Sequence, residues 1–152
     1  MAVDYKPKGA KTVTPYLAVP RVPALIEFLK ATFDAKEIDR AVRPDGGIMN
    51  ATIEIGDSRL MMGDPGDRPP ETAMLYVYVQ DCDAVYEKAL AAGATSLMAP
   101  TDQFYGDRCA AVQDGSGNKW WLATHKEDLT AEEGEKRVAA RFGWHATKEG
   151  HR

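Results

Sequence analysis

The stretch Thr14-Pro15-Tyr16-Leu17-Ala18-Val19 has a counterpart 60 residues later, Met74-Leu75-Tyr76-Val77-Tyr78-Val79. Both stretches suit a strand whose side chains alternate between two faces. The same offset relates residues 13–64 to residues 73–124, and seven of these pairs are identical, among them Tyr16 with Tyr76. The sequence therefore predicts two tandem modules, joined by a polar, proline-rich connector at residues 64–72.

The order of elements also repeats. In each copy the first strand precedes a helical pattern: Val22 to Phe33 with Pro23 in the first turn, and a segment after Asp81 that ends near Gly93. Pairs of strands with tight turns follow, at 49–55 with 58–62 and at 108–113 with 119–124. The fold class predicted is α+β, with strand, helix and a run of strands occurring twice.

The C-terminal segment differs in character from the two modules. Thr130 and Glu133 form a capping box, and Gly143 can end the helix that it starts. We expect a single domain over residues 1–128 and a helical tail over residues 129–152. Packing on a partner subunit is one role open to this tail.

Composition excludes several classes of protein. The 152 residues carry 19 Lys and Arg against 23 Asp and Glu, so the chain lacks the basic footprint of a nucleic-acid-binding protein. No apolar run reaches the roughly 20 residues of a membrane span, and the N-terminus has no secretory core, which predicts a cytoplasmic protein. Cys82 and Cys109 form no CxxC pair, and we expect both thiols to be reduced.

One predicted sheet face is rich in aromatic and thioether side chains. Alternation places Tyr16 on the face that the helices leave uncovered, and it places Met74, Tyr76 and Tyr78 on the equivalent face of the second copy. An uncovered face with these side chains and few charges is typical of a small-molecule cleft. The alternative is a closed interior or a dimer contact.

Two segments of the second module resemble signatures of PhnB-like proteins. The first is FYGDR at residues 104–108, which is similar to YGDR, and the second is QDGSGNKWWLATH at residues 113–125, which is similar to DPFGHxWxLATH. PhnB-like proteins are a branch of the vicinal oxygen chelate superfamily, which includes glyoxalase I, bleomycin-resistance proteins and extradiol dioxygenases. The resemblance covers residues 12–128. It implies two βαβββ modules that form a cupped mixed sheet around a site, commonly in a homodimer.

The resemblance also implies where a metal would bind. Each module of the metal enzymes supplies one ligand from its first strand and one from its last, and these positions correspond to Thr14, Met61, Met74 and Trp121. None is a histidine or a carboxylate, and a hard divalent cation needs charged oxygen or nitrogen donors. Asn50, Thr52 and Asn118 likewise stand where many relatives carry ligands or proton carriers. We therefore predict a protein with no metal and no other cofactor.

The function predicted is binding of a small, partly aromatic molecule in the cup. Aromatic rings would stack on the ligand and polar groups would orient it. One alternative is an enzyme, a lyase, an isomerase or a dioxygenase-like protein, with Tyr16, Asp107 or His125 as acid or base. Another is a dimeric scaffold without a ligand. The predicted ligand-binding residues are Thr14, Tyr16, Asn50, Thr52, Met61, Met74, Tyr76, Tyr78, Phe104, Arg108, Gln113 and Trp121.

Overall fold

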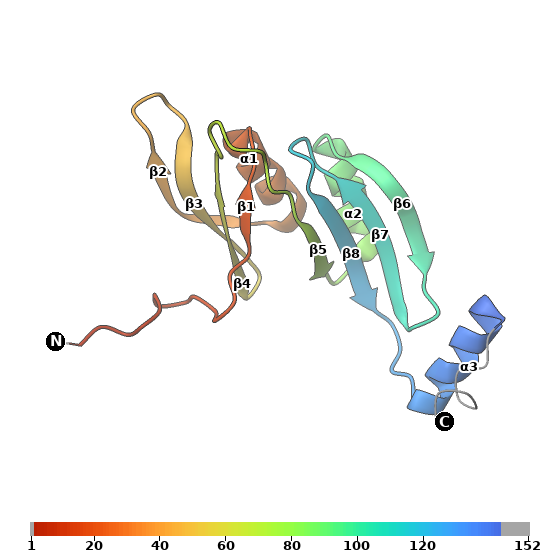
Figure 1. The fold of residues 1–152 in the computed structure, drawn as a ribbon. Coiled ribbons are helices and arrows are strands. Elements are labelled where there is room, and N and C mark those ends of the chain that lie inside the picture. Colours follow the sequence, from red (N-terminus) through yellow and green to blue (C-terminus); the bar gives the residue numbers. More distant parts are fainter. Residues whose placement is uncertain (1, 144–152) are drawn as a thin grey trace.

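The structure, a computed structural model, describes residues 2–143 and contains the two predicted modules (Figure 1). The first comprises β1 (Tyr16–Ala18), α1 (Val22–Phe33), β2 (Lys36–Val42), β3 (Ile48–Ile55) and β4 (Ser58–Gly63). The second comprises β5 (Met74–Tyr78), α2 (Cys82–Ala91), β6 (Thr95–Asp102), β7 (Asp107–Gln113) and β8 (Lys119–His125). The α+β class and the βαβββ order of each module are thus confirmed.

Strand register confirms the offset of 60 residues. The strands form two four-stranded mixed sheets, in the orders β1-β4-β3-β2 and β5-β8-β7-β6. In each sheet the first strand runs parallel to the last, and Tyr16 lies opposite Met61 as Tyr76 lies opposite Trp121. The two copies therefore share one pairing geometry, although their eight strands do not join into a single hydrogen-bonded sheet.

The hydrophobic core lies between the sheets and their helices, which both cover the same side of the molecule (Figure 1). In the first module Leu17, Ile53 and Met62 are buried, because alternation turns them toward α1. In the second module Trp120 is fully buried, and its ring lies 5.6 Å from that of Phe33 at the end of α1. This contact joins the cores of the two modules.

Both capping predictions for helix starts are confirmed. The Asp81 carboxylate accepts a hydrogen bond from the Ala84 amide at the start of α2. Thr130 does the same for the Glu133 amide at the start of α3 (Ala131–Phe142). Helix α3 has no buried residue, and Arg137 ties it to the main domain by donating to the Phe104 carbonyl. The rest of the predicted tail, residues 144–152, lies outside the described part of the chain.

None of the helices within residues 2–143 is long and apolar enough to cross a membrane. This agrees with the absence of a long apolar run in the sequence.

The loop before α1 holds one residue in an unusual backbone conformation. Arg21 has a φ of 61°, in the left-handed region that residues with a Cβ rarely adopt. Its guanidinium donates to the Gly115 carbonyl, and the Ser116 hydroxyl donates to the Pro20 carbonyl at 2.7 Å. The turn between β7 and β8 is thereby fastened to the first module.

We expect Arg21→Ala to destabilise the protein more than Arg21→Gly does. Both variants lose the bond to Gly115, but only glycine adopts a positive φ without steric cost, which is worth about 1 kcal/mol. Urea unfolding of the two variants and the parent measures the difference. Equal stability of the two variants would show that the backbone at this position is not strained.

Candidate ligand-binding site

The helix-free face of the first sheet carries four of the predicted ligand-binding residues. Tyr16 lies opposite Met61, which lies opposite Thr52, and residues paired in this way point to the same side of a sheet. Asn50 lies two residues from Thr52 on the same strand and shares its face. The Tyr16 hydroxyl donates to the Met49 carbonyl, and the remaining three side chains are partly exposed.

The corresponding face of the second sheet carries three aromatic rings. Tyr76 lies opposite Trp121, and its ring stacks on the indole with 6.3 Å between centroids and 13° between planes. The Tyr78 ring lies 5.4 Å from that of Tyr76, at 65° to it. We call Tyr76, Tyr78 and Trp121 the aromatic face. Met74 lies beside it at the start of β5 and is mostly exposed.

A buried carboxylate lies at one end of the aromatic face. Asp107 is only 5 % exposed and accepts hydrogen bonds from the hydroxyls of Tyr76 at 2.7 Å and Tyr78 at 3.4 Å. Its other oxygen lies 2.7 Å from Nδ1 of His125, whose Nε2 lies 2.7 Å from the carboxylate of Asp128. Asp107 and His125 are paired across β7 and β8, so the sheet register brings them together.

These contacts shift the pKa values of the groups involved. Burial raises the pKa of Asp107, but the hydrogen bonds from His125 and Tyr76 outweigh burial, and the net shift is downward. The hydrogen bonds to Asp107 and Asp128 raise the pKa of His125. Desolvation and the hydrogen bond with Cys109 raise the pKa of Tyr76. The arrangement therefore favours an ionised carboxylate, a protonated imidazole and a neutral phenol.

Cys109 completes this cluster. Its thiol is fully buried, 2.9 Å from the Tyr76 hydroxyl and 3.4 Å from the Tyr105 hydroxyl. Since the Tyr76 proton is donated to Asp107, the phenol oxygen is left to accept from the thiol or from Tyr105. A continuous chain of hydrogen-bonding groups thus connects a buried thiol to the exposed Asp128.

Four predicted ligand-binding residues lie elsewhere. Arg108 points to the helix side of the second sheet, where it is paired with Asp83 and Asp102. The Phe104 ring lies 5.7 Å from that of Phe142 in α3, beside the tail. Thr14 precedes β1, and its hydroxyl donates to the Lys11 carbonyl. Gln113 shares the side of the aromatic face but lies at the far end of β7, opposite Lys119.

The positions that would hold a metal in this fold do not fit one. Thr14, Met61, Met74 and Trp121 offer a hydroxyl, two thioethers and an indole, with no charge to balance a divalent cation. Asn118, which stands where many relatives carry a ligand or a proton carrier, is fully buried. Its side-chain NH₂ group donates to Asp114, and its side-chain oxygen accepts from the Ala73 backbone amide. Within residues 2–143, no three His, Cys, Asp or Glu side chains come together at a spacing suited to an ion.

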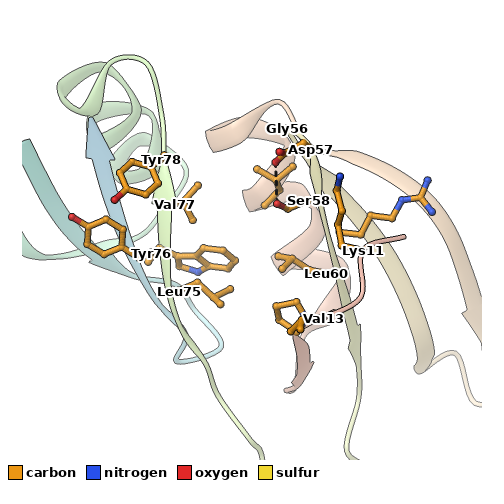
Figure 2. Close-up of a pocket in the computed structure, with 14 residues that line it drawn as sticks. Lys11, Val13, Gly56, Asp57, Ser58, Leu60, Leu75, Tyr76, Val77 and Tyr78 are labelled. Atoms are coloured by element: carbon orange, nitrogen blue, oxygen red, sulfur yellow. Dashed lines mark hydrogen bonds between the residues drawn. The ribbon is translucent and has the colours of Figure 1, made fainter. Parts of the chain in front are cut away.

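A groove of about 430 Å³ lies between the modules, along the outer edge of β5. Figure 2 shows Leu75 and Val77 pointing across it toward Leu60 and Val13, whereas Tyr76 and Tyr78 point away from it. Its walls are mainly apolar, and most of the predicted ligand-binding residues do not line it. Tyr76 and Tyr78 nevertheless belong to its lining, so the groove and the aromatic face adjoin along β5.

The two sets of predicted residues lie on two separate sheet faces within one chain. Among the described residues, the side-chain hydrogen bonds and ring contacts of these two faces stay within one sheet. The two faces therefore belong to two separate four-stranded sheets.

Alternation and the register of the repeat could have located the Asp107 cluster. Along β7, Asp107 and Cys109 point to one face of the sheet, and Arg108, which lies between them, points to the other. The same register brings Cys109 opposite Ala123, which pairs with Tyr78. No comparable pattern points to Tyr105, which reaches the cluster from the turn between β6 and β7.

The His125 interactions predict a pH dependence of stability. The folded-state pKa of His125 is raised. The contribution of His125 to the free energy of unfolding is therefore fully present below its ordinary pKa of 6.5 and is lost as the pH rises through the folded-state pKa. Asp107 has a lowered pKa, so its contribution is present above its ordinary 3.8 and is lost as the pH falls through the folded value.

We therefore expect His125→Gln to be less stable than the parent at about pH 6, with a gap that narrows by about pH 9. Urea unfolding of both proteins across this range measures the gap. A gap that is constant over the whole range would contradict a protonated His125 between the two carboxylates.

Comparison with known proteins agrees with this fold. Residues 11–122 match the family model described as the glyoxalase/bleomycin resistance protein/dioxygenase superfamily. An uncharacterized protein of Mycobacterium bovis is 30 % identical over 145 residues, which cover 88 % of this chain and 93 % of that protein. An uncharacterized protein of Mycobacterium tuberculosis H37Rv is also 30 % identical and is covered over 83 % of its length.

Solved structures show the same architecture. TioX from Micromonospora sp. ML1 has a TM-score of 0.66 and 22 % identity, with 76 % of this chain and 99 % of that chain covered. A PhnB protein from Bacillus cereus, described as a putative 3-demethylubiquinone-9 3-methyltransferase, has a TM-score of 0.63 and 19 % identity, with 75 % and 99 % covered. With two βαβββ modules and a family match over most of its length, this chain belongs to the glyoxalase/bleomycin resistance protein/dioxygenase superfamily.

Proposed function

We propose that the protein binds a small, partly aromatic molecule without the help of a metal and that it does so in the cytoplasm. The observation that carries this proposal is the aromatic face, whose Tyr76 and Tyr78 rings are 40 % and 65 % exposed although they lie on an ordered sheet. Large aromatic side chains left uncovered together are typical of surfaces that bind another molecule. The unsuitable donors at the metal positions support a binding role over the metal chemistry of the superfamily.

The proposal includes a homodimer. The first-sheet face with Tyr16, Asn50 and Met61 and the aromatic face belong to different sheets of one chain. A second copy can place its first-sheet face over the aromatic face, and each ligand would then lie between two chains. Sedimentation equilibrium tests this, and a monomer at all concentrations would contradict it.

A panel of small aromatic and amphipathic molecules tests the binding function. A molecule that binds the folded state raises the free energy of unfolding by about 2.7 kcal/mol at one hundred times its Kd. We expect at least one member to raise the Tm, and Trp121→Ala to abolish the rise. Tyr5→Ala removes an aromatic ring from the N-terminal segment, where Tyr5 is 89 % exposed, and serves as the control.

If no member of the panel shifts the Tm, the binding function is refuted and a dimeric scaffold without a ligand is favoured. A shift that persists in Trp121→Ala would place the site elsewhere.

The pairing of Asp107 with His125 favours a second candidate, an enzyme that uses acid–base chemistry. A buried carboxylate that holds one nitrogen of an exposed, protonated imidazole is an arrangement that orients a general acid. Turnover that survives chelators and is lost in Asp107→Asn would support a lyase or isomerase. Turnover lost on chelation would instead point to a metal enzyme.

A further inference from the structure

The aromatic face offers a ligand aromatic rings rather than hydroxyl protons. The Tyr76 and Tyr78 hydroxyls both donate to Asp107, so neither phenol has a proton left for a ligand. Trp121 lies nearly parallel to Tyr76, and Tyr78 packs against Tyr76 at 65°, so these two neighbours flank the Tyr76 ring. Tyr78 is 65 % exposed, so a ligand placed against its ring meets π-electron density.

The net charge at the end of the aromatic face is negative. Asp107 lies at the hydroxyl ends of the two phenols, and a phenol that donates to a carboxylate gains electron density in its ring. When His125 is protonated, it balances only one of the two carboxylates that it bridges, Asp107 and Asp128. The group thus retains a net negative charge at the end of the aromatic face.

No cation of the described chain occupies these rings. The Lys and Arg side chains that lie over aromatic rings within residues 2–143 are Lys6 over Tyr5 and Arg141 over Phe142. Arg108, the nearest arginine along β7, points to the other side of the sheet and is bound to Asp83. The face combines exposed, electron-rich rings with a net negative charge that no Lys or Arg side chain within residues 2–143 covers.

We propose that the aromatic face binds an organic cation, an alkylated or quaternary ammonium group. Such a group is attracted to the faces of Trp and Tyr rings. A quaternary ammonium also needs no hydrogen-bond acceptor, because all its outward atoms are methyl or methylene groups. This inference rests on the proposed binding function, for which it names the ligand class.

Choline and its uncharged carbon isostere 3,3-dimethyl-1-butanol test the inference, since they differ only in the charged centre. Titration followed by ¹H–¹⁵N correlation spectra gives a Kd for each probe and reports the Trp121 indole N–H, which Trp121→Phe assigns. We expect choline to bind about ten-fold more tightly, as a partly desolvated cation–π contact provides.

Variants separate the contribution of the rings from that of the charge. Tyr78→Leu removes one wall and should abolish the preference, whereas Tyr78→Phe keeps the ring and should retain most of it. Asp107→Asn should weaken the preference several-fold. Glu87→Gln makes the same change in net charge on an exposed position of α2, on the helix side, and should leave the preference unchanged.

Each other outcome overturns the inference. Equal affinities for the two probes would refute the cation but retain the binding function. If choline does not shift the Trp121 signal while a neutral member of the panel does, the cation alone is again refuted. If no molecule shifts this signal, both the cation and the binding function fail.

Discussion

Asp114→Ala is expected to lower the free energy of unfolding by about 3 to 5 kcal/mol. The Asp114 carboxylate, 6 % exposed, accepts from the Ser116 and Asn118 amides, from the Asn118 side chain and from Nε1 of Trp120 at 2.8 Å. Alanine leaves the two side-chain donors buried without a partner, and each such donor costs about 1 to 3 kcal/mol. Because Asn118 in turn accepts from the Ala73 amide, the start of β5 should loosen as well.

The internal repeat provides a matched control. Asp57 lies in the corresponding turn between β3 and β4, is exposed and accepts only from the Ser58 hydroxyl. We expect Asp57→Ala to change the free energy of unfolding by less than about 0.5 kcal/mol. Urea unfolding measures both variants. Similar losses in the two would contradict the view that Asp114 is the buried anchor of its turn.

The sequence predicted the fold well because the repeat carries strong local signals. Strand alternation, Pro23 in the first turn of α1 and the Asp81 cap each depend on residues close together in the chain. The offset of 60 then reappears in the register, with Leu17 opposite Met62 and Val77 opposite Leu122. Local rules and the repeat therefore located the first and the last two strands and the helix of each module, whereas β2 and β6 followed only from the family resemblance.

The candidate site was less predictable, because side-chain partners depend on contacts between distant strands. Tyr76 and Asp107 lie 31 residues apart in the chain. Their side chains meet across β8, which lies between β5 and β7 in the sheet. Arg108 was expected to orient a ligand, but Asp83 of α2 holds it on the opposite side. The sequence marks Asn118 only by the ligand that relatives carry at this position, whereas in the structure its side chain bonds to Asp114 and to the Ala73 amide and fastens a turn.

Removing the carboxylate of the aromatic face should have the other large effect. We expect Asp107→Ala to lower the free energy of unfolding by about 2 to 3 kcal/mol, because a buried acceptor of hydrogen bonds from Tyr76 and His125 is lost. The pKa of His125 should fall back toward its ordinary value of 6.5, since its largest upward influence is gone. Urea unfolding and NMR titration of the His125 ring measure the two effects.

Asp83→Ala is the control for this variant, because it removes an exposed carboxylate on the helix side of the same sheet. Its loss of stability should be much smaller, as is usual for an exposed ion pair.

A double-mutant cycle distinguishes direct coupling between Asp107 and His125 from two independent losses. If the 2.7 Å contact is the main role of His125, then His125→Gln should cost much less in the Asp107→Ala background than in the parent. The difference should be largest near pH 6, where His125 is protonated, and should shrink as the pH rises through its raised pKa. Additive losses at every pH would mean that Asp107 stabilises the sheet through the two tyrosines alone, with His125 held at the surface by Asp128.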